Sequence, residues 1–210
     1  MPGLIHGLDP ARIQANLEAV RAEVGADVEV LAATKYVPID EMGALAEAGV
    51  ELVGENRLQE LQAKHERWAE AFAWDFIGNV QSRKVKEILP LVRLIHSVAS
   101  DSALAQLERH APAELEVLVE VNVAGEESKG GVEPDELAGF IERSPVRVTG
   151  LMTMPPFSED PEHSRPYFAR IAELAAAHDL SRLSMGTSQD WRVAVEEGAT
   201  IIRLGTALYI

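Results

Sequence analysis

The chain alternates short apolar runs with longer stretches in which apolar residues recur every three or four positions. The short runs are rich in β-branched residues and are typical of buried strands, whereas the periodic stretches are typical of helices that pack by one face. The pattern predicts eight strands, at about 28–35, 51–54, 74–78, 92–98, 115–123, 146–152, 181–185 and 200–204. It predicts helices at about 10–24, 38–49, 58–65, 80–89, 101–110, 133–142, 164–177 and 191–197.

Strands and helices that alternate every 25 residues or so are the pattern of parallel βα units, and eight such units close into a barrel. The expected fold is therefore an α/β fold, a TIM-type (β/α)8 barrel formed by residues 1–210 as a single domain. A doubly wound open sheet is the alternative, because strand order is not visible in one sequence. No glycine-rich dinucleotide-binding fingerprint follows the first predicted strand, which weighs against that alternative.

The charge balance narrows the possible partners. With Lys+Arg 19 and Asp+Glu 34, the net charge is -15, and no basic patch offsets it. Such a chain is expected to repel nucleic acid and anionic membrane surfaces. No apolar run reaches the roughly 20 residues of a membrane span and no signal-peptide pattern begins the chain, so we expect a cytoplasmic protein. The absence of cysteine excludes thiolate chemistry, and no metal site is expected.

Lys35 ends the first predicted strand, 28–35. In a parallel barrel the carboxyl end of a strand lies at the mouth, where such barrels keep their functional residues. An amine held against the apolar top of a barrel is expected to lose solvation, which lowers its pKa and leaves more of it nucleophilic. Lys35 is thus a candidate Schiff-base lysine, and a solvated residue just after a strand is the simpler interpretation.

Two glycine-containing loops form a candidate phosphate site. Barrels frequently hold phosphate in the loops after strands seven and eight. Ser188 follows the seventh predicted strand and is expected to cap the helix at Trp191, while Gly205 and Thr206 follow the eighth. Each loop alone is equally consistent with an ordinary loop and helix cap. Together with a strand-end lysine, the two loops indicate pyridoxal 5′-phosphate (PLP), whose aldehyde takes an amine.

Arg203 lies in the last predicted strand, two residues before Gly205, so the two positions share a face. A guanidinium at the pyridine nitrogen of PLP would disfavour protonation of that nitrogen, and the cofactor would then be a poor electron sink. The alternative is a barrel-end arginine in a salt bridge. His96, inside an apolar strand, is expected to be a hydrogen-bonded core histidine rather than a base.

Seven motifs resemble, in order, those of the pyridoxal phosphate homeostasis protein family, a family of alanine-racemase-like PLP-binding proteins. They are Ala32-Ala33-Thr34-Lys35, Gly54-Glu55-Asn56-Arg57, Phe76-Ile77-Gly78 with Gln81-Ser82, Glu120-Val121-Asn122 with Lys129-Gly130, Gly150-Leu151-Met152-Thr153-Met154, Leu183-Ser184-Met185-Gly186 with Ser188 and Asp190, and Arg203-Leu204-Gly205-Thr206. The resemblance covers nearly the whole chain and implies a barrel like the alanine racemase N-terminal domain.

The resemblance also implies roles for individual residues. Lys35 matches the Schiff-base lysine, and Arg203 matches the arginine at the pyridine nitrogen. Asn56 matches a position beside the cofactor ring. The phosphate-binding positions are matched by Ser188, Gly205 and Thr206.

The chain departs from the family pattern at two places. Asp75 precedes Phe76 where the family usually has histidine, so no ring contact is assigned to that position. The chain also ends at Ile210, just beyond the eighth predicted strand. Lys129, in a charged turn, is expected either to reach over the barrel mouth or to lie in solvent.

Racemisation on PLP needs two positioned acid/base groups, and Lys35 supplies one. In the racemase that the barrel resembles, the opposing tyrosine comes from a second, β-rich domain, for which this chain has no residues left. We therefore expect a monomeric carrier or buffer of PLP without catalytic turnover, with PLP-dependent apo-enzymes as recipients. A minimal amino-acid racemase is the alternative, and an aldolase-type barrel in which Lys35 condenses with a sugar carbonyl is the third.

Overall fold

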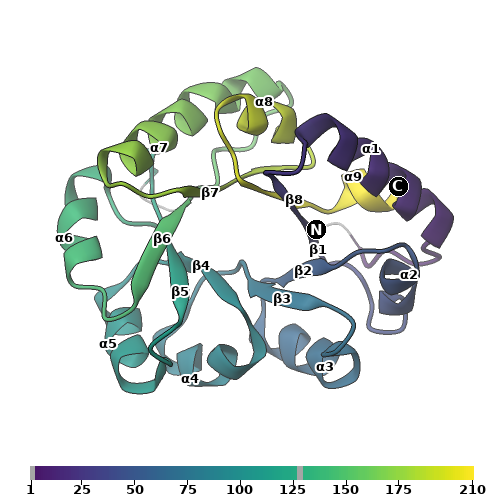
Figure 1. Cartoon of the computed structure of the whole chain (residues 1–210), viewed down its shortest axis with the longest axis horizontal. Helices are drawn as coiled ribbons and strands as arrows, with labels where there is room; N and C mark the ends of the chain where they lie inside the picture. The colour runs from purple at the N-terminus through teal and green to yellow at the C-terminus, as the bar shows by residue number, and fades with distance from the viewer. Residues whose placement is uncertain (1–2, 127–129) are drawn as a thin grey trace.

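The computed structural model describes residues 3–126 and 130–210, and in these ranges eight parallel strands form a closed barrel (Figure 1). Each strand pairs with the next along the chain, and β8 pairs with β1 to close the sheet. The strands are β1 (Glu29–Ala33), β2 (Leu52–Glu55), β3 (Ala73–Phe76), β4 (Leu94–Val98), β5 (Glu116–Glu120), β6 (Arg147–Met152), β7 (Arg182–Thr187) and β8 (Ile201–Leu204). The predicted TIM-type barrel is confirmed, and the open-sheet alternative is excluded.

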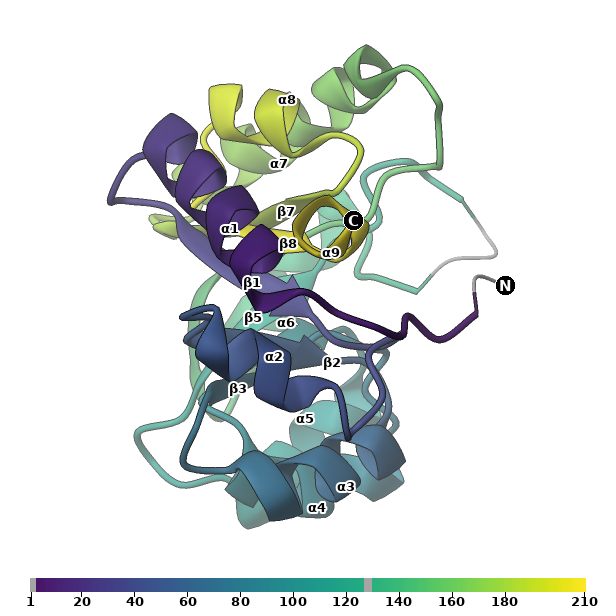
Figure 2. The same cartoon turned by 90° about the vertical axis from the view of Figure 1, so that its right-hand side faces the viewer.

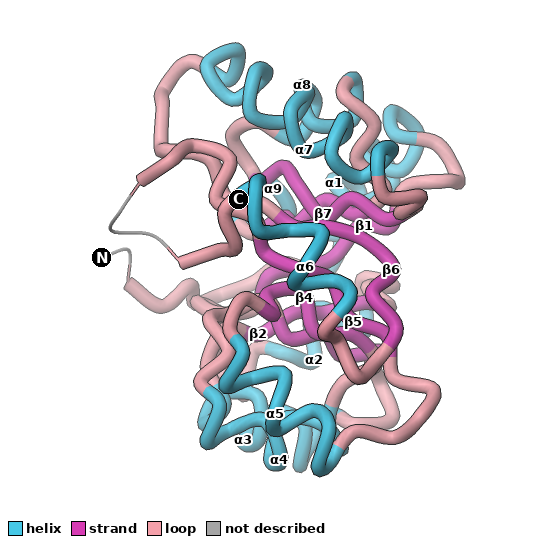
Figure 3. The backbone as a smooth tube through the Cα atoms, turned by 90° about the vertical axis from the view of Figure 1, so that its left-hand side faces the viewer, coloured by secondary structure: helices cyan, strands magenta, loops and turns pink. Residues whose placement is uncertain are grey.

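Helices cover the outside of the barrel (Figures 1 and 3). They are α1 (Pro10–Val24), α2 (Met42–Glu47), α3 (Leu58–Trp68), α4 (Val85–Ile88), α5 (Asp101–His110), α6 (Leu137–Glu142), α7 (Arg165–Ala177), α8 (Trp191–Glu196) and α9 (Thr206–Tyr209). In the described ranges, no helix combines the length and the apolar character that a membrane crossing requires.

Several helical regions differ from the prediction, and the segment 133–142 begins as a 3₁₀ turn over Pro134–Glu136 before α6. The segment expected to be one helix over 80–89 consists of a 3₁₀ turn, the four residues of α4, and a second 3₁₀ turn over Leu89–Leu91. Pro90 lies in that last turn and has no backbone N–H to donate, so a regular helix does not continue there. The short helix α9 after β8 was not predicted, because only four residues follow Thr206.

Alternate residues of the strands point into the barrel. The apolar residues of this interior are Leu31, Ala33, Leu52, Leu94, Leu118, Met152 and Ile201, with Ile77 packed against them. The same inward faces also carry polar residues: His96 lies two residues after Leu94, and Arg203 two residues after Ile201. The interior of the barrel is therefore partly polar.

The N-terminal segment lies at the end of the barrel where the strands finish (Figure 2). The backbone N–H of Ile5 donates to the carbonyl of Tyr36 at 2.8 Å. The two carboxylate oxygens of Glu41 accept from the N–H groups of Gly7 and Leu8, at 2.8 and 3.1 Å. These bonds fix the segment beside the residues that follow β1.

Gly150 gives a test of strand packing. In β6 it pairs with Arg182 of β7, and a Cβ atom at this position would lie 2.0 Å from the carbonyl oxygen of Arg182. Because a backbone atom would have to move, Gly150→Ala is expected to lower the free energy of unfolding by about 3 kcal/mol. Urea unfolding at fixed pH measures this change.

Gly139→Ala is the matched control. Gly139 lies in α6, and a Cβ atom there meets only the flexible side chain of Arg143, at 3.2 Å. Alanine is favoured over glycine in a helix, so this variant is expected to gain about 0.5–1 kcal/mol. Equal stability of the two variants would contradict the role assigned to Gly150.

Candidate functional site

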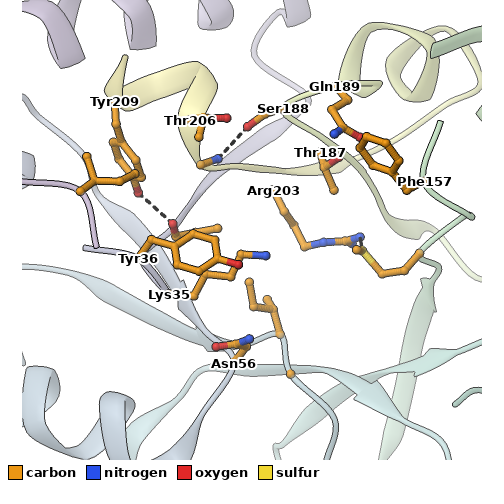
Figure 4. A pocket seen from close by; sticks show the side chains of 16 residues that line it. Lys35, Tyr36, Asn56, Phe157, Thr187, Ser188, Gln189, Arg203, Thr206 and Tyr209 are labelled. Carbon is orange, nitrogen blue, oxygen red and sulfur yellow. Dashed lines mark hydrogen bonds between the residues drawn. The ribbon is translucent and has the colours of Figure 1, made fainter. Parts of the chain in front are cut away.

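A pocket of about 560 Å³ opens at the carboxyl end of the strands (Figure 4). Its size is that of a small-molecule site. The structure brings all six residues predicted to bind the cofactor into its lining: Lys35, Asn56, Ser188, Arg203, Gly205 and Thr206. Ile77, Met154 and Phe157 add apolar surface to the same pocket.

The charge of this pocket is opposite to that of the chain. The net charge of the chain is -15, yet Lys35 and Arg203 line the pocket and none of its described lining residues is acidic. Two cations without a lining carboxylate favour an anionic ligand. The pocket is thus suited to a phosphorylated small molecule.

Lys35 lies two residues beyond the end of β1. Its amine lies 5.2 Å from the centre of the Tyr36 ring and has no hydrogen-bond partner among the described residues. The expected loss of solvation is not observed, because the residue is exposed at the mouth of the pocket. The lysine therefore combines a place in the pocket with access to water.

Tyr209, the last residue of α9, holds the strand end next to Lys35. Its hydroxyl donates to the carbonyl of Ala33 at 3.1 Å (Figure 4). Burial raises the pKa of Tyr209, and the nearby Glu55 carboxylate raises it further. The phenol therefore stays protonated at neutral pH and remains a hydrogen-bond donor to the strand.

Ser188 connects the two candidate phosphate loops. Its hydroxyl oxygen accepts from the N–H of Gly205 at 3.0 Å and from the N–H of Ala207 at 3.2 Å. The prediction that Ser188 caps α8 is therefore wrong, since its contacts are with the start of α9. Asp190 is the N-cap residue of α8, but its carboxylate accepts from the N–H of Thr187, before the helix, at 2.7 Å.

Arg203 is 5% exposed and is held by four hydrogen bonds. Nη1 donates to the carbonyl and hydroxyl oxygens of Ser184, at 2.7 and 2.5 Å. Nη2 donates to the carbonyl of Thr153 and to the sulfur of Met154, each at 2.9 Å. A guanidinium has five N–H donors, so the Nε–H is the one left without an acceptor in the described part of the chain.

No described carboxylate lies within ion-pair distance of Arg203, so the salt-bridge alternative is not observed. Burial lowers the pKa of Arg203 to about 10, and attraction to Glu120 and Asp190 opposes that shift. The guanidinium is therefore still charged at neutral pH. It is a buried cation that lines the pocket and keeps one N–H donor without a described acceptor.

A chain of hydrogen bonds leads from Arg203 through the barrel interior. The Ser184 hydroxyl lies 2.8 Å from His96 Nδ1, and His96 Nε2 lies 3.0 Å from Asp75 Oδ2. Asp75 Oδ1 also accepts from Arg93 Nε at 2.9 Å, and Arg93 pairs with Glu29 at the amino-terminal end of the barrel. His96 is thus the hydrogen-bonded core histidine that was predicted.

The direction of each hydrogen bond in this series follows from the protonation state of His96. Desolvation by burial lowers the pKa of His96, partly opposed by Asp75, while Arg203 and Arg93 add to the lowering. The neutral ring donates from Nε2 to the Asp75 carboxylate and accepts at Nδ1 from Ser184. Asp75 is not among the residues that line the pocket, and its carboxylate contacts His96 and Arg93.

The sequence did not reveal a buried ion pair beneath Lys35. Lys64 of α3 and Glu55 of β2 are in contact and almost wholly buried. The signal was present: Lys64 lies three residues after Leu61 and six after Leu58, on the apolar face of the helix. Lys129, the other lysine considered for this region, lies outside the described residues.

Comparison with known proteins agrees with this architecture. The family described as alanine racemase, N-terminal domain, matches residues 8–210. The pyridoxal phosphate homeostasis protein of Aquifex aeolicus is 42% identical over 195 residues, which cover 86% of each chain. The protein of the same name from Vibrio cholerae is 32% identical over 224 residues, covering 94% of this chain and 95% of that one.

Solved structures give the same result. PipY of Synechococcus elongatus, solved with PLP bound, has a TM-score of 0.83 at 30% identity and matches 94% of this chain and 100% of its own. Alanine racemase of Corynebacterium glutamicum shares the fold with a TM-score of 0.76 at 16% identity. That match covers 100% of this chain and 63% of the racemase.

The state of His96 predicts a pH dependence of stability. Below the ordinary histidine pKa of 6.5 the unfolded chain binds a proton at this residue, whereas the folded protein, with its lowered pKa, does not. The contribution of neutral His96 to the free energy of unfolding is therefore fully present above pH 6.5. It is lost as the pH falls from there towards the pKa of His96 in the folded protein. The free energy of unfolding is expected to fall more steeply than in His96→Gln, by up to about 1.4 kcal/mol per pH unit. Parallel curves from denaturant unfolding of the two proteins at several pH values would contradict this assignment.

Proposed function

The chain belongs to the pyridoxal phosphate homeostasis proteins, within the alanine racemase N-terminal domain family, and we propose that it binds PLP in the pocket at the barrel mouth. The observation that carries the proposal is the pair of cations, Lys35 and Arg203, in a pocket without a described acidic lining residue. PLP is an anionic aldehyde, and it requires both an amine and an anion site. The residues of the pocket fit each part of the cofactor.

Three groups would hold the three ends of PLP. The amine of Lys35 would form a Schiff base with the aldehyde. The unused Nε–H of Arg203 would donate to an unprotonated pyridine nitrogen. Ser188 and Thr206 would bind the phosphate beside Gly205, whose N–H donates to the Ser188 hydroxyl, and Asn56 would lie beside the ring. Bound PLP supplies an electrophilic carbon and an electron-withdrawing ring.

We propose that the protein holds and releases PLP as a carrier or buffer rather than turning over a substrate. Racemisation needs a second acid/base group besides Lys35. Tyr209 lines the pocket, but its hydroxyl is bonded to the Ala33 carbonyl, and Tyr36 directly follows Lys35 in the same turn. A cation at the pyridine nitrogen further weakens the ring as an electron sink. PLP-dependent apo-enzymes in the cytoplasm are the proposed recipients, and the proposed carrier is a monomer.

Addition of PLP to the purified protein tests the Schiff base. A visible absorption band is expected, and borohydride reduction followed by peptide mass spectrometry is expected to place the adduct on Lys35. Lys35→Ala should lose both the band and the adduct. Lys86→Ala, which removes an exposed lysine of α4, is the matched control and should keep them.

Two results would argue against this proposal. An adduct spread over surface lysines would mean that the pocket serves another ligand, and the aldolase alternative would then be favoured. Rapid racemase turnover by the pure protein would instead favour the amino-acid racemase alternative.

The role of Ser188 can be tested by PLP titration. Ser188→Ala removes the oxygen that accepts from Gly205 and Ala207, and it also removes one hydroxyl from the pocket. A lost hydrogen bond of about 1 kcal/mol corresponds to roughly fivefold weaker binding of PLP. Ser158→Ala, outside the pocket, should bind as the wild type does. Equal affinities of the two variants would remove Ser188 from the phosphate site.

A further inference from the structure

A buried ion pair lies beneath the residues that line one side of the pocket. The Nζ of Lys64 and the Oε1 of Glu55 lie 2.5 Å apart, and the two side chains are 1% and 0% exposed. Such a pair does not in general stabilise a fold, because the loss of hydration of two ions offsets their attraction. The hydrogen bonds of this pair indicate a different role, which is to fix the main chain next to residues of the pocket.

Each side chain of the pair makes a hydrogen bond to the peptide group just before a residue of the pocket. The Nζ of Lys64 donates to the carbonyl oxygen of Thr34 at 2.9 Å, in the peptide that joins Thr34 to Lys35. The Oε2 of Glu55 accepts from the N–H of Asn56 at 3.2 Å. The hydroxyl of Thr34 donates to Oε1 of Glu55 at 2.7 Å and connects the two sides.

The sheet holds only one of these two peptide groups, because the carbonyl of Glu55 accepts from the N–H of Ile77, just after β3, at 2.9 Å. Strand β1 ends at Ala33 and β2 ends at Glu55, and beyond them only the bond from Thr34 N–H to the Gly54 carbonyl, at 3.0 Å, continues the ladder between the two. The carbonyl of Ala33 accepts from Tyr209 of α9, and the carbonyl of Thr34 accepts from Lys64 of α3 and, within its own turn, from the N–H of Val37 at 2.8 Å. The main chain before Lys35 is therefore fixed by side chains from two helices in addition to its own turn.

We propose that Lys64 and Glu55 are positioning residues for the PLP site. By fixing the peptides before Lys35 and Asn56, they place the free amine of Lys35 where it meets the aldehyde of a ligand whose phosphate is held by the opposite loops. Holding reactive groups at a fixed separation is the main route by which a protein favours a bond between them. This inference rests on the proposed function, in which Lys35 bonds PLP.

Two ligands separate positioning from general loosening of the fold. Pyridoxine 5′-phosphate has the ring and phosphate of PLP but no aldehyde, so its affinity does not depend on where the Lys35 amine lies. In Lys64→Met, PLP binding is expected to weaken about tenfold or more, because the amine is misplaced, whereas pyridoxine 5′-phosphate binding changes less than about threefold. Equilibrium titration of both ligands, well below the unfolding temperature, gives the ratio of the two affinities.

Thr34→Val is the second variant and covers the case in which Lys64→Met does not fold. It keeps both charges and the side-chain shape, and removes the hydroxyl with its contacts to Glu55 Oε1 at 2.7 Å and to the Gly54 carbonyl at 3.2 Å. The affinity for PLP relative to that for pyridoxine 5′-phosphate is expected to fall, as in Lys64→Met, but only by about threefold. Ile171→Ala, a fully buried residue of α7, is the control that loses stability while the ratio stays at the wild-type value.

The outcomes are distinct. A wild-type ratio in the folded variants, or an equal loss of affinity for both ligands, would overturn the positioning role while the wild-type adduct on Lys35 stands. Absence of a reducible adduct on Lys35 in the wild-type protein would overturn the proposed function, and this inference with it.

Discussion

The pairing of β1 with β8 is the constraint on which the site depends. In that register Leu31 lies opposite Arg203, so the first and last strands place their carboxyl ends side by side. Lys35 and Gly205 are far apart in the sequence, yet each lies within two residues of the end of one of these strands. All strands are parallel, so every loop that lines the pocket leaves the sheet at the same end. Closure of the barrel therefore brings the amine and the candidate phosphate loops together.

The polar interior of the barrel decides how Arg203 meets a ligand. A buried guanidinium must satisfy its donors or incur a large desolvation penalty. Ser184 and the segment after β6 accept from four of them. The Ser184 hydroxyl is in turn hydrogen-bonded to His96, which is hydrogen-bonded to Asp75. The guanidinium thus has little freedom to turn, and under the proposed function the Nε–H is the donor that it offers to the ligand. The same hydrogen bonds that make burial of the charge acceptable also fix its orientation.

The parts of the site that depend on local position along the chain can be predicted from the sequence. Lys35 and Gly205 are recognisable because each follows an apolar strand, and strand ends predict the mouth of a barrel. The contacts of Ser188 were not predictable, because its partners belong to a different loop and to α9, an element too short to leave a periodic pattern. Lys64 carried a helical signal, but its partner Glu55 lies on a strand whose four residues are all buried, where periodicity does not separate the faces.

The exposure of Lys35 and the burial of Arg203 assign different roles to the two cations of the pocket. Under the proposed function, Lys35 and the aldehyde of PLP form a Schiff base with loss of water, and hydrolysis reverses that bond, so the exposure of Lys35 gives water a route to it. A carrier needs that reversibility, whereas an enzyme that must protect a reactive carbanion gains by excluding water. The hydrogen bonds of Arg203 lie within the barrel, so its position does not depend on the exposed mouth. Under the proposed function, recognition thus resides in the rigid interior and release in the open mouth.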